Sequence, residues 1–319
     1  MVASRRSRVK PALSQTTDFT GFFWVLASSG TRGYRCAVSA TLSDLRFSLA
    51  GPGKVGSSLA GWAVAAGAEL LTVAGRGTLG ELATGGQDLL LLALPDAALA
   101  AAAAELARRP QAAVVLHTSG SLDAGALAPL RAAGSAVGSL HPLKAFPEPL
   151  PDPAEARGVF FAVDGDAPAR ELAARLAAAW GGIPGEVPPA ARPLYHFAAT
   201  LAAGGVVTLL AAAGELGERL GLPPAVTRGY LELARGAVAA AGRGLDSGRP
   251  LAASITGPVA RGDAATLSRQ LGALRASAAD KLPLARALAA ETAHQRQGLG
   301  EDLSALVSTL RTELEEPRN

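Results

Sequence analysis

The sequence predicts an α/β protein: a Rossmann domain with a doubly wound, mostly parallel sheet, followed by an all-α C-terminal domain. Three observations support this fold class. A complete G-x-G-x-x-G motif at residues 51–56 comes directly after an apolar run. Apolar runs then alternate with helix-forming stretches as far as residue 180, which is typical of a parallel sheet covered on both faces. After the Gly- and Pro-rich segment 181–189, only helix-like stretches remain.

The glycine motif predicts a nucleotide site because a short strand, 47–50, precedes it and a helix follows from residue 57. Gly51 would make the tight turn, Gly53 would admit a pyrophosphate to the backbone, and Gly56 would let helix and strand pack closely. The helix N-terminus would hold the phosphate charge. Pro52 has no N–H, so the donors are expected from Gly53, Lys54 and Val55. The alternative is an ordinary glycine-rich turn in a chain with 37 glycines.

The other elements follow in order along the chain. Further strands are expected at 70–74, 89–94, 114–117, 136–140 and 159–163, with helices between them at 97–108, 123–133 and 168–180. Helices of the second domain are expected at 190–220, 224–241, 263–277 and 281–297. The resulting division is a disordered N-terminal extension at 1–44, the Rossmann domain at 45–184, a helical substrate and dimerisation domain at 185–310, and a tail at 311–319.

Composition excludes several classes of function. The chain is 49% hydrophobic and 18% charged, as expected of a globular protein. Its net charge of +3 comes from the first 44 residues, which carry six basic and two acidic side chains, so the body has no nucleic-acid footprint. The same segment resembles a transit peptide, and a disordered extension or an upstream start codon also explains it. The single cysteine, Cys36, excludes an internal disulfide and a thiolate zinc cluster, so we expect no metal site and a cytoplasmic location.

An uncharged run at 197–214 reaches the length of a membrane span. Its residues are mostly Ala and Gly, which contribute little to insertion, and no second span accompanies it. We therefore expect a buried helix in a soluble domain and no membrane association. Ala- and Gly-rich helices pack closely, so this domain is expected to form a homodimer.

The end of the second strand bears on the choice of cofactor. NAD-preferring Rossmann domains place an acidic residue there to bind the ribose 2′-hydroxyl. Here the strand ends in Arg76, whose planar guanidinium suits a 2′-phosphate, so NADP is expected and NAD is less favoured. Arg76 could also be a solvated strand-end residue. Leu94 and Pro95 end the next strand, where they would shape the ribose pocket or simply terminate the strand.

Several segments together resemble the bacterial proteins that join a Rossmann-like domain to the domain of unknown function 2520. That group consists of NADP-dependent oxidoreductases distantly similar to β-hydroxyacid dehydrogenases and to pyrroline-5-carboxylate reductase. The resemblance covers roughly residues 45–300. It rests on the segments at 51–56, 88–96, 117–121, 139–146, 194–196 and 256–263, of which His-Pro-Leu-x-x-Phe and Thr-Gly-Pro-Val-Ala-Arg-Gly-Asp are the most specific.

Candidates for chemistry lie where predicted strands end, at the edge where open α/β sheets bind ligands. His141 and His196 are the expected proton donors or acceptors for a hydride-transfer reaction. His117 is assigned to the cofactor pocket, and Ser119 and Lys144 to substrate binding. Each has a structural alternative: a histidine at the core edge, a hydroxyl capping a turn, or a surface charge.

The chain departs from the resembled group at two positions. Arg192 stands where that group often has lysine, and Gly204 stands where the related dehydrogenases carry asparagine. The missing lysine and asparagine put β-hydroxyacid chemistry in doubt.

Two functions therefore stay open. One is an NADP-dependent oxidoreductase acting on a small carbonyl, imine or hydroxy-acid substrate in an interdomain cleft, and the other is a non-catalytic NADP-binding regulatory or sensor protein. The loop 256–263, with Arg261, is expected to close over the cleft or to lie at a dimer interface, and Asp263 is expected to cap the helix that follows it.

Overall fold

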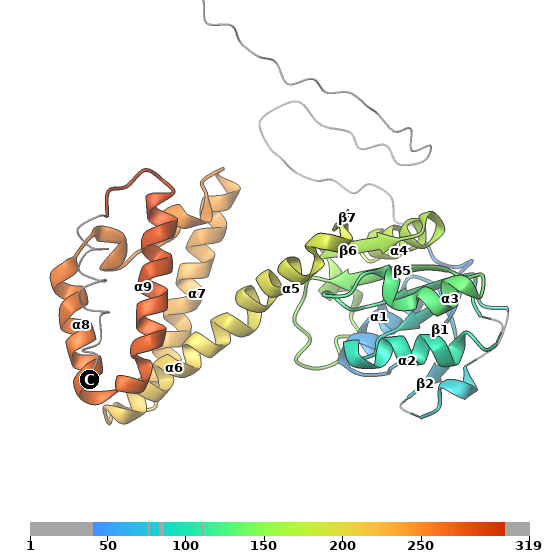
Figure 1. Cartoon of the computed structure of the whole chain (residues 1–319), viewed down its shortest axis with the longest axis horizontal. Helices are drawn as coiled ribbons and strands as arrows, with labels where there is room; N and C mark the ends of the chain where they lie inside the picture. The colour runs from blue at the N-terminus through green and yellow to red at the C-terminus, as the bar shows by residue number, and fades with distance from the viewer. Residues whose placement is uncertain (1–40, 76, 83–85, 110, 304–319) are drawn as a thin grey trace, which may run out of the picture.

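The computed structural model describes residues 41–303 except 76, 83–85 and 110. It confirms the fold class: an α/β domain with a seven-stranded, mostly parallel sheet is followed by a helical region (Figure 1). The predicted extension 1–44 is described only at 41–44, and the tail 311–319 lies outside the described residues. Leu42 is fully buried in the core, so the packed domain already includes residues before 45.

The strand order is β2-β1-β3-β4-β5-β6-β7, and neighbouring strands from β2 to β5 pair in parallel. Because these five strands run in the same direction, their carboxyl ends lie along the same edge of the sheet. His117, the last residue of β4, pairs with Ser139 of β5, and β5 continues past it to His141. The strands are β1 (Arg46–Ala50), β2 (Glu69–Ala74), β3 (Leu89–Leu92), β4 (Val114–His117), β5 (Ala136–Pro142), β6 (Phe160–Gly165) and β7 (Ile183–Glu186).

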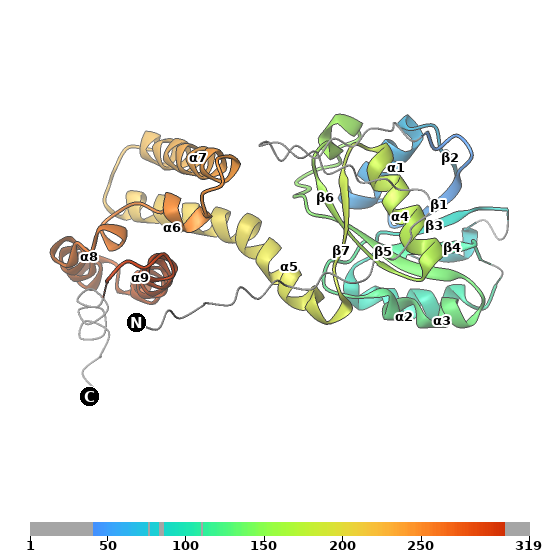
Figure 2. The same ribbon diagram turned by 90° about the horizontal axis from the view of Figure 1, so that it is seen from above.

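Helices cover both faces of the sheet (Figure 2). On one face, α1 (Lys54–Ala65) and α4 (Ala167–Ala179) bury an apolar cluster centred on Trp62, which lies against the rings of Phe161 and Trp180. On the other face, α2 (Asp96–Leu106) and α3 (Ala128–Ala132) cover a leucine- and alanine-rich cluster. These two cores fix the strand ends on which the site is built.

Short helical turns connect the longer elements: η1 (Leu79–Glu81), η2 (Ala124–Leu127), η3 (Pro153–Ala156), η4 (Pro189–Ala191), η6 (Leu251–Ser254), η7 (Val259–Arg261) and η8 (Ala279–Lys281).

Two strands at one side of the sheet differ from the simple parallel pattern. β6 runs antiparallel to β5, and β7 then pairs in parallel with β6. β7 is not predicted from the sequence, because its residues, Ile-Pro-Gly-Glu, are typical of a turn. As an edge strand, β7 tolerates Pro184 and Gly185, since proline is confined to sheet edges.

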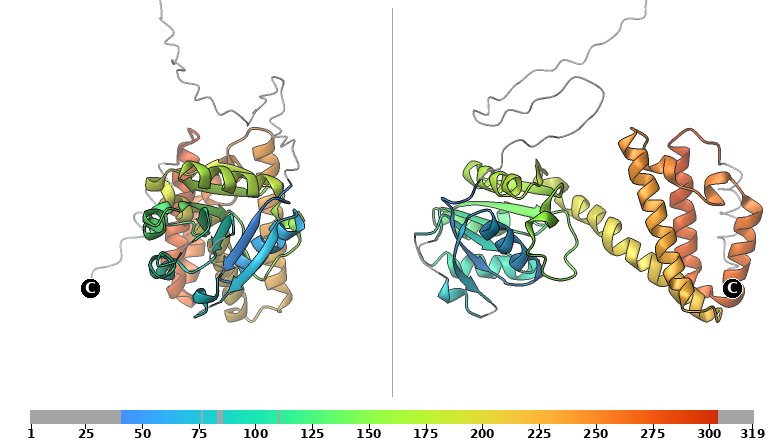
Figure 3. Two further views of the ribbon diagram at one scale, coloured as in Figure 1. Left: turned by 90° about the vertical axis from the view of Figure 1, so that its right-hand side faces the viewer. Right: turned by 180° about the vertical axis from the view of Figure 1, so that it is seen from behind.

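The helical region begins with one long helix that leaves the sheet and joins the remaining helices (Figures 1 and 3). It comprises α5 (Arg192–Thr200), a π-helical turn η5 (Leu201–Gly205) and α6 (Val206–Arg219). A π-helical turn inside a helix is uncommon and here coincides with the pair Gly204-Gly205. The helices α7 (Ala225–Asp246), α8 (Ala264–Ser277) and α9 (Leu282–Gln297) follow, with α7 packed along α6 and α8 packed against α9.

The expectation that 197–214 forms a buried helix is wrong for the single chain. The helix Pro189–Arg219 is long and apolar enough to cross a membrane, and only 6% of its most apolar window is buried. Within the described residues it is the one helix that meets these criteria, and a single such helix is weak evidence for a span. The physical reason for its exposure is its position: it bridges two bodies, so neither covers most of it.

The loop 256–263 lies in the helical region, where η7 packs beside α9. Asp263 caps α8 as predicted, because its carboxylate accepts a hydrogen bond from Thr266 N at 3.0 Å. Gly262 ends η7 with a φ of 67°, a left-handed conformation that favours glycine. In Figure 1 this end of the helical region lies far from the sheet, so the loop does not close over the cavity of its own chain.

Candidate active site

A cavity of about 1080 Å³ lies at the carboxyl edge of the parallel strands. The glycine loop forms one end, the β3–α2 and β4–η2 connections form its floor, and the end of β5 with the start of α5 forms the other end. Ten of the predicted site residues line it: Gly51, Gly53, Lys54, Val55, Leu94, Pro95, Ser119, His141, Lys144 and His196.

The glycine loop has the geometry of a phosphate cradle. Gly51 has a φ of 91°, and a Cβ there would collide with Ala93 O. A Cβ on Gly56 would collide with Gly51 O, so this glycine permits the close packing of α1 on the loop. Nothing lies within 4 Å of the position that a Cβ of Gly53 would take, which leaves the backbone open to the cavity. Because α1 begins at Lys54, its first N–H groups face that opening and can hold phosphate oxygens.

The end of β2 borders the same cavity through Gly75 and Gly77. Arg76, the predicted partner of a 2′-phosphate, lies outside the described residues. Thr78 turns back over this strand end, because its Oγ1 accepts a hydrogen bond from Gly75 N at 2.9 Å. This strand end carries no carboxylate, so the neighbouring residues fit a 2′-phosphate better than an unmodified ribose.

Two histidines face one another at the far end of the cavity. The rings of His141, from β5, and His196, from α5, lie with their centroids 5.6 Å apart at 82°. Both point at Gly120: an ideal Cβ on that glycine would be 2.5 Å from His196 Nδ1 and 2.7 Å from His141 Nε2. The two nitrogens therefore converge on one small region of the cavity wall, which is a suitable arrangement for handling a proton on a single ligand atom.

The imidazole rings of His141 and His196 make few hydrogen bonds to the protein. His141 Nδ1 lies 3.0 Å from the hydroxyl of Tyr195, and the two rings meet edge to face. His196 Nδ1 is buried and has no hydrogen-bond partner within the described part of the chain. A buried, unpaired nitrogen that lines a cavity is available to a ligand.

His117, in contrast, does not face the cavity. It is fully buried, and its Nδ1 accepts a hydrogen bond from Ser119 N at 3.2 Å while its Nε2 lies 2.9 Å from Asp123 O. With both nitrogens occupied and no exposed surface, the ring holds the β4–η2 loop in shape. His117, which was expected in the cofactor pocket, is therefore not among the residues that line the cavity.

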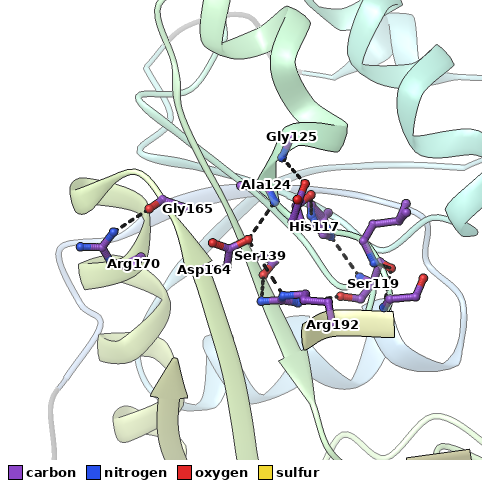
Figure 4. A network of polar contacts seen from close by, with 12 residues as sticks. His117, Ser119, Ala124, Gly125, Ser139, Asp164, Gly165, Arg170 and Arg192 are labelled. Carbon is purple, nitrogen blue, oxygen red and sulfur yellow. Dashed lines mark hydrogen bonds and ion pairs between the residues drawn. The ribbon is translucent and has the colours of Figure 1, made fainter. Parts of the chain in front are cut away.

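Arg192 forms a buried network beneath the site (Figure 4). Its guanidinium is wholly buried, donates to Ser139 Oγ and to Ser119 O, and lies 4.0 Å from the carboxylate of Asp164. Asp164 in turn accepts a hydrogen bond from Ala124 N at 2.9 Å. Since Arg192 is the first residue of α5, this network anchors the long helix to the ends of β4, β5 and β6.

Burial, and to a smaller extent the Arg192 cation, controls the charge on His117 and His141. Burial, together with the nearby His196 and Arg192, lowers the pKa of His141 to about 4. Burial likewise lowers the pKa of His117 to about 4. Burial also raises the pKa of Tyr195 to about 12. At neutral pH His141 is therefore an uncharged imidazole and Tyr195 an uncharged phenol.

Ser119 and Lys144 line the cavity but already have protein partners. The hydroxyl of Ser119 accepts hydrogen bonds from Ser121 N at 3.2 Å and Leu122 N at 3.0 Å, so it caps a turn, as its structural alternative anticipated. The ammonium of Lys144 lies 2.8 Å from Glu155. An anionic ligand would have to compete with Glu155 for this charge.

Three residues of the site were not singled out by sequence. Tyr195 lies in the segment 194–196 but was not assigned a role; its spacing beside His196 on one helical turn was the available signal. Gly120 leaves space for the rings of His141 and His196, and sequence gives no sign of this because the two histidines lie in distant segments. Asp96, at the start of α2, lines the cavity and accepts a hydrogen bond from Ser121 Oγ at 2.5 Å.

Family models match two parts of the chain. A Rossmann-like domain matches residues 76–142, and the domain of unknown function DUF2520 matches residues 159–292. No protein of curated function matches the sequence significantly.

Solved structures share the fold at low sequence identity. A Bacteroides fragilis protein provisionally named an NADP oxidoreductase is 18% identical, with a TM-score of 0.64 over 80% of this chain and all of that chain. The reductive aminase of Aspergillus terreus, with NADPH bound, is 19% identical, with a TM-score of 0.53 over 83% of this chain and 98% of that one. The pyrroline carboxylate reductase of Plasmodium falciparum, with NADP bound, is 14% identical, with a TM-score of 0.51 over 80% and 99%.

Proposed function

Because the chain joins a Rossmann-like domain to a DUF2520 domain, we propose that it is an NADP-dependent oxidoreductase acting on a small carbonyl, imine or hydroxy-acid substrate. One observation carries the proposal: a single cavity runs from an open glycine loop at the start of α1 to a pair of facing histidines at the end of β5 and the start of α5. The first end suits a pyrophosphate and the second suits proton chemistry.

The cofactor end of the proposal rests on the loop and the neighbouring strand ends. The N–H groups of Gly53, Lys54 and Val55 would hold the pyrophosphate, with the charge of Lys54 beside them. Leu94 and Pro95 would border the ribose next to β3. The absence of an acidic residue at the end of β2 favours NADP over NAD, and the NADP- and NADPH-bound relatives of similar fold agree with this choice.

The reduced cofactor would supply a hydride to the substrate carbon, and the chain must manage the charge on the adjacent heteroatom. Neutral His141 can direct a ring nitrogen at that atom, and His196 Nδ1 is free to donate or accept a proton there. Burial, with smaller contributions from His196 and Arg192, keeps His141 uncharged, so its role is hydrogen bonding, not release of a proton as an imidazolium. Ser119 and Lys144 remain candidates for contacts with the rest of the substrate.

Kinetics with matched cofactor titrations test the proposal. NADPH absorbance should fall in the presence of at least one member of a panel of keto acids, aldehydes and imines. His141→Asn should lower turnover by about 10² to 10³-fold, as expected for disturbing a preorganised hydrogen-bond donor. His196→Asn should lower it by about 10² to 10⁴-fold, the usual contribution of general acid–base catalysis. The NADPH dissociation constant should stay nearly unchanged in both variants. Unchanged turnover in both variants would remove the histidines from the mechanism.

The same experiment addresses the alternative of a non-catalytic NADP sensor, which the absent lysine and asparagine suggested. A sensor would bind NADPH at the cavity and consume it with no member of the panel. The convergence of His141 and His196 on one point favours catalysis, because cofactor binding alone does not require it.

We also propose that two chains associate through the helical region, as expected for a cytoplasmic homodimer. Large apolar side chains are exposed along the long helix, including Leu194, Phe197, Leu201 and Val207. The first three recur at intervals of three and four residues and so form one stripe. An exposed apolar stripe of this length is typical of a surface that is covered by another protein, and a second copy is the simplest partner.

A further inference from the structure

The contact between Tyr195 and His141 joins two elements that are far apart in sequence. His141 lies near the end of β5, and Tyr195 lies in the first turn of α5, which Arg192 anchors beside it. The phenol oxygen is 3.0 Å from His141 Nδ1, and the rings meet at 86° with their centroids 5.6 Å apart. This distance is that of a hydrogen bond, and the ring contact restricts rotation of the imidazole.

The chemistry of the two groups decides which of them donates. A neutral imidazole has one N–H and one bare nitrogen, and the hydrogen bond made by one nitrogen determines which nitrogen holds the proton. Within the described residues the Tyr195 hydroxyl has no hydrogen-bond partner other than His141 Nδ1. If Nδ1 carried the proton, the phenol O–H would lack a protein acceptor in its half-buried position, which costs free energy. Donation from Tyr195 to Nδ1 satisfies both groups.

We propose that Tyr195 is a positioning residue that fixes His141 in the tautomer with the proton on Nε2, so that this nitrogen presents a hydrogen-bond donor to the reacting heteroatom of the substrate. Nε2 is the nitrogen that converges with His196 Nδ1 beside Gly120, on the cavity wall. A donor there stabilises the negative charge that develops when the substrate accepts a hydride. This inference rests on the proposed function only for its catalytic consequence; the tautomer itself is a property of the ligand-free protein.

Nitrogen NMR of the full chain labelled at histidine tests the inference directly. The chain has four histidines, and single histidine variants assign their ring signals. Protonated and bare ring nitrogens resonate in separate regions, so each tautomer is read from the spectrum. In the ligand-free protein at neutral pH, His141 should be bare at Nδ1 and protonated at Nε2. In Tyr195→Phe, His141 should lose this preference and populate both tautomers, whereas the matched control Tyr230→Phe, on α7, should leave the spectrum unchanged.

Kinetics then separate this inference from the proposed function. If the proposed function holds, Tyr195→Phe should lower kcat by about tenfold, less than the 10²-fold or more expected when an acid–base group itself is removed, because the imidazole remains. The NADPH dissociation constant should stay nearly unchanged. A wild-type spectrum with the proton on His141 Nδ1 would overturn the inference, and so would an unaltered tautomer in Tyr195→Phe. Should the variant fail to fold, the wild-type spectrum still decides. The expected spectra without turnover on any substrate would instead refute the proposed function alone.

Discussion

Replacing Gly120 tests whether the positions of His141 and His196 matter, because the substitution displaces their rings and removes no functional group. The ideal Cβ of Gly120→Ala would lie 2.5 Å from His196 Nδ1, 2.7 Å from His141 Nε2 and 2.9 Å from His141 Cδ2. Ordinary contact distances are about 3.5 to 4.0 Å, so both rings must retreat by about 1 Å. A displacement of about 1 Å in a catalytic site can cost about 10²-fold in rate. We therefore expect kcat to fall by about two orders of magnitude.

The assay for this variant pairs turnover with cofactor affinity and stability. The NADPH dissociation constant should stay nearly unchanged, because the glycine loop lies at the other end of the cavity. The free energy of unfolding should drop by about 1 to 3 kcal/mol, as expected of overpacking. Gly229→Ala on α7 is the matched control, since nothing lies within 4 Å of its Cβ position. Turnover of Gly120→Ala equal to that of wild type would refute the role of the histidine geometry.

Three further expectations concern the supporting structure. Arg192→Met should lower the free energy of unfolding by about 3 kcal/mol in urea titrations, because it leaves Asp164 buried beside an apolar side chain; a loss below about 1 kcal/mol would contradict the buried network. From pH 6.5 down to about 4, the free energy of unfolding should decrease by up to about 1.4 kcal/mol per pH unit for each of His117 and His141. The unfolded chain binds a proton in that window while the folded chain does not, so a flat profile would refute the burial of these rings. Sedimentation should show a dimer at micromolar concentration and a monomer for Leu201→Glu, and a monomeric wild type would reject the dimer.

Local patterns in the sequence predicted most of the fold because strand and helix periods, glycines and caps are short-range signals. The strand predicted at 114–117 matches β4, and Asp263 caps α8 as expected. β7 was missed because an edge strand needs neither alternation nor freedom from proline. The burial of 197–214 was predicted wrongly because composition does not reveal whether another element of the same chain covers a helix.

In the candidate site, too, features built from neighbouring residues could be predicted from the sequence, whereas contacts between distant segments could not. The phosphate loop could be predicted because all its parts lie within residues 51–56. His141 and His196 could be named from their strand and helix ends, but their convergence on Gly120 depends on the register of β4 against β5 and on the anchor of α5. His117 shares the strand-end position of His141, and only the structure shows that both of its nitrogens are occupied.

A crystal structure of the full chain with NADP bound would show whether one cavity joins a dinucleotide cradle to the histidine pair. We expect the pyrophosphate on the N–H groups of Gly53, Lys54 and Val55, with the nicotinamide ring extending toward His141 and His196 and leaving room for a small substrate between them. A pyrophosphate bound elsewhere, or a nicotinamide directed away from both histidines, would contradict this expectation.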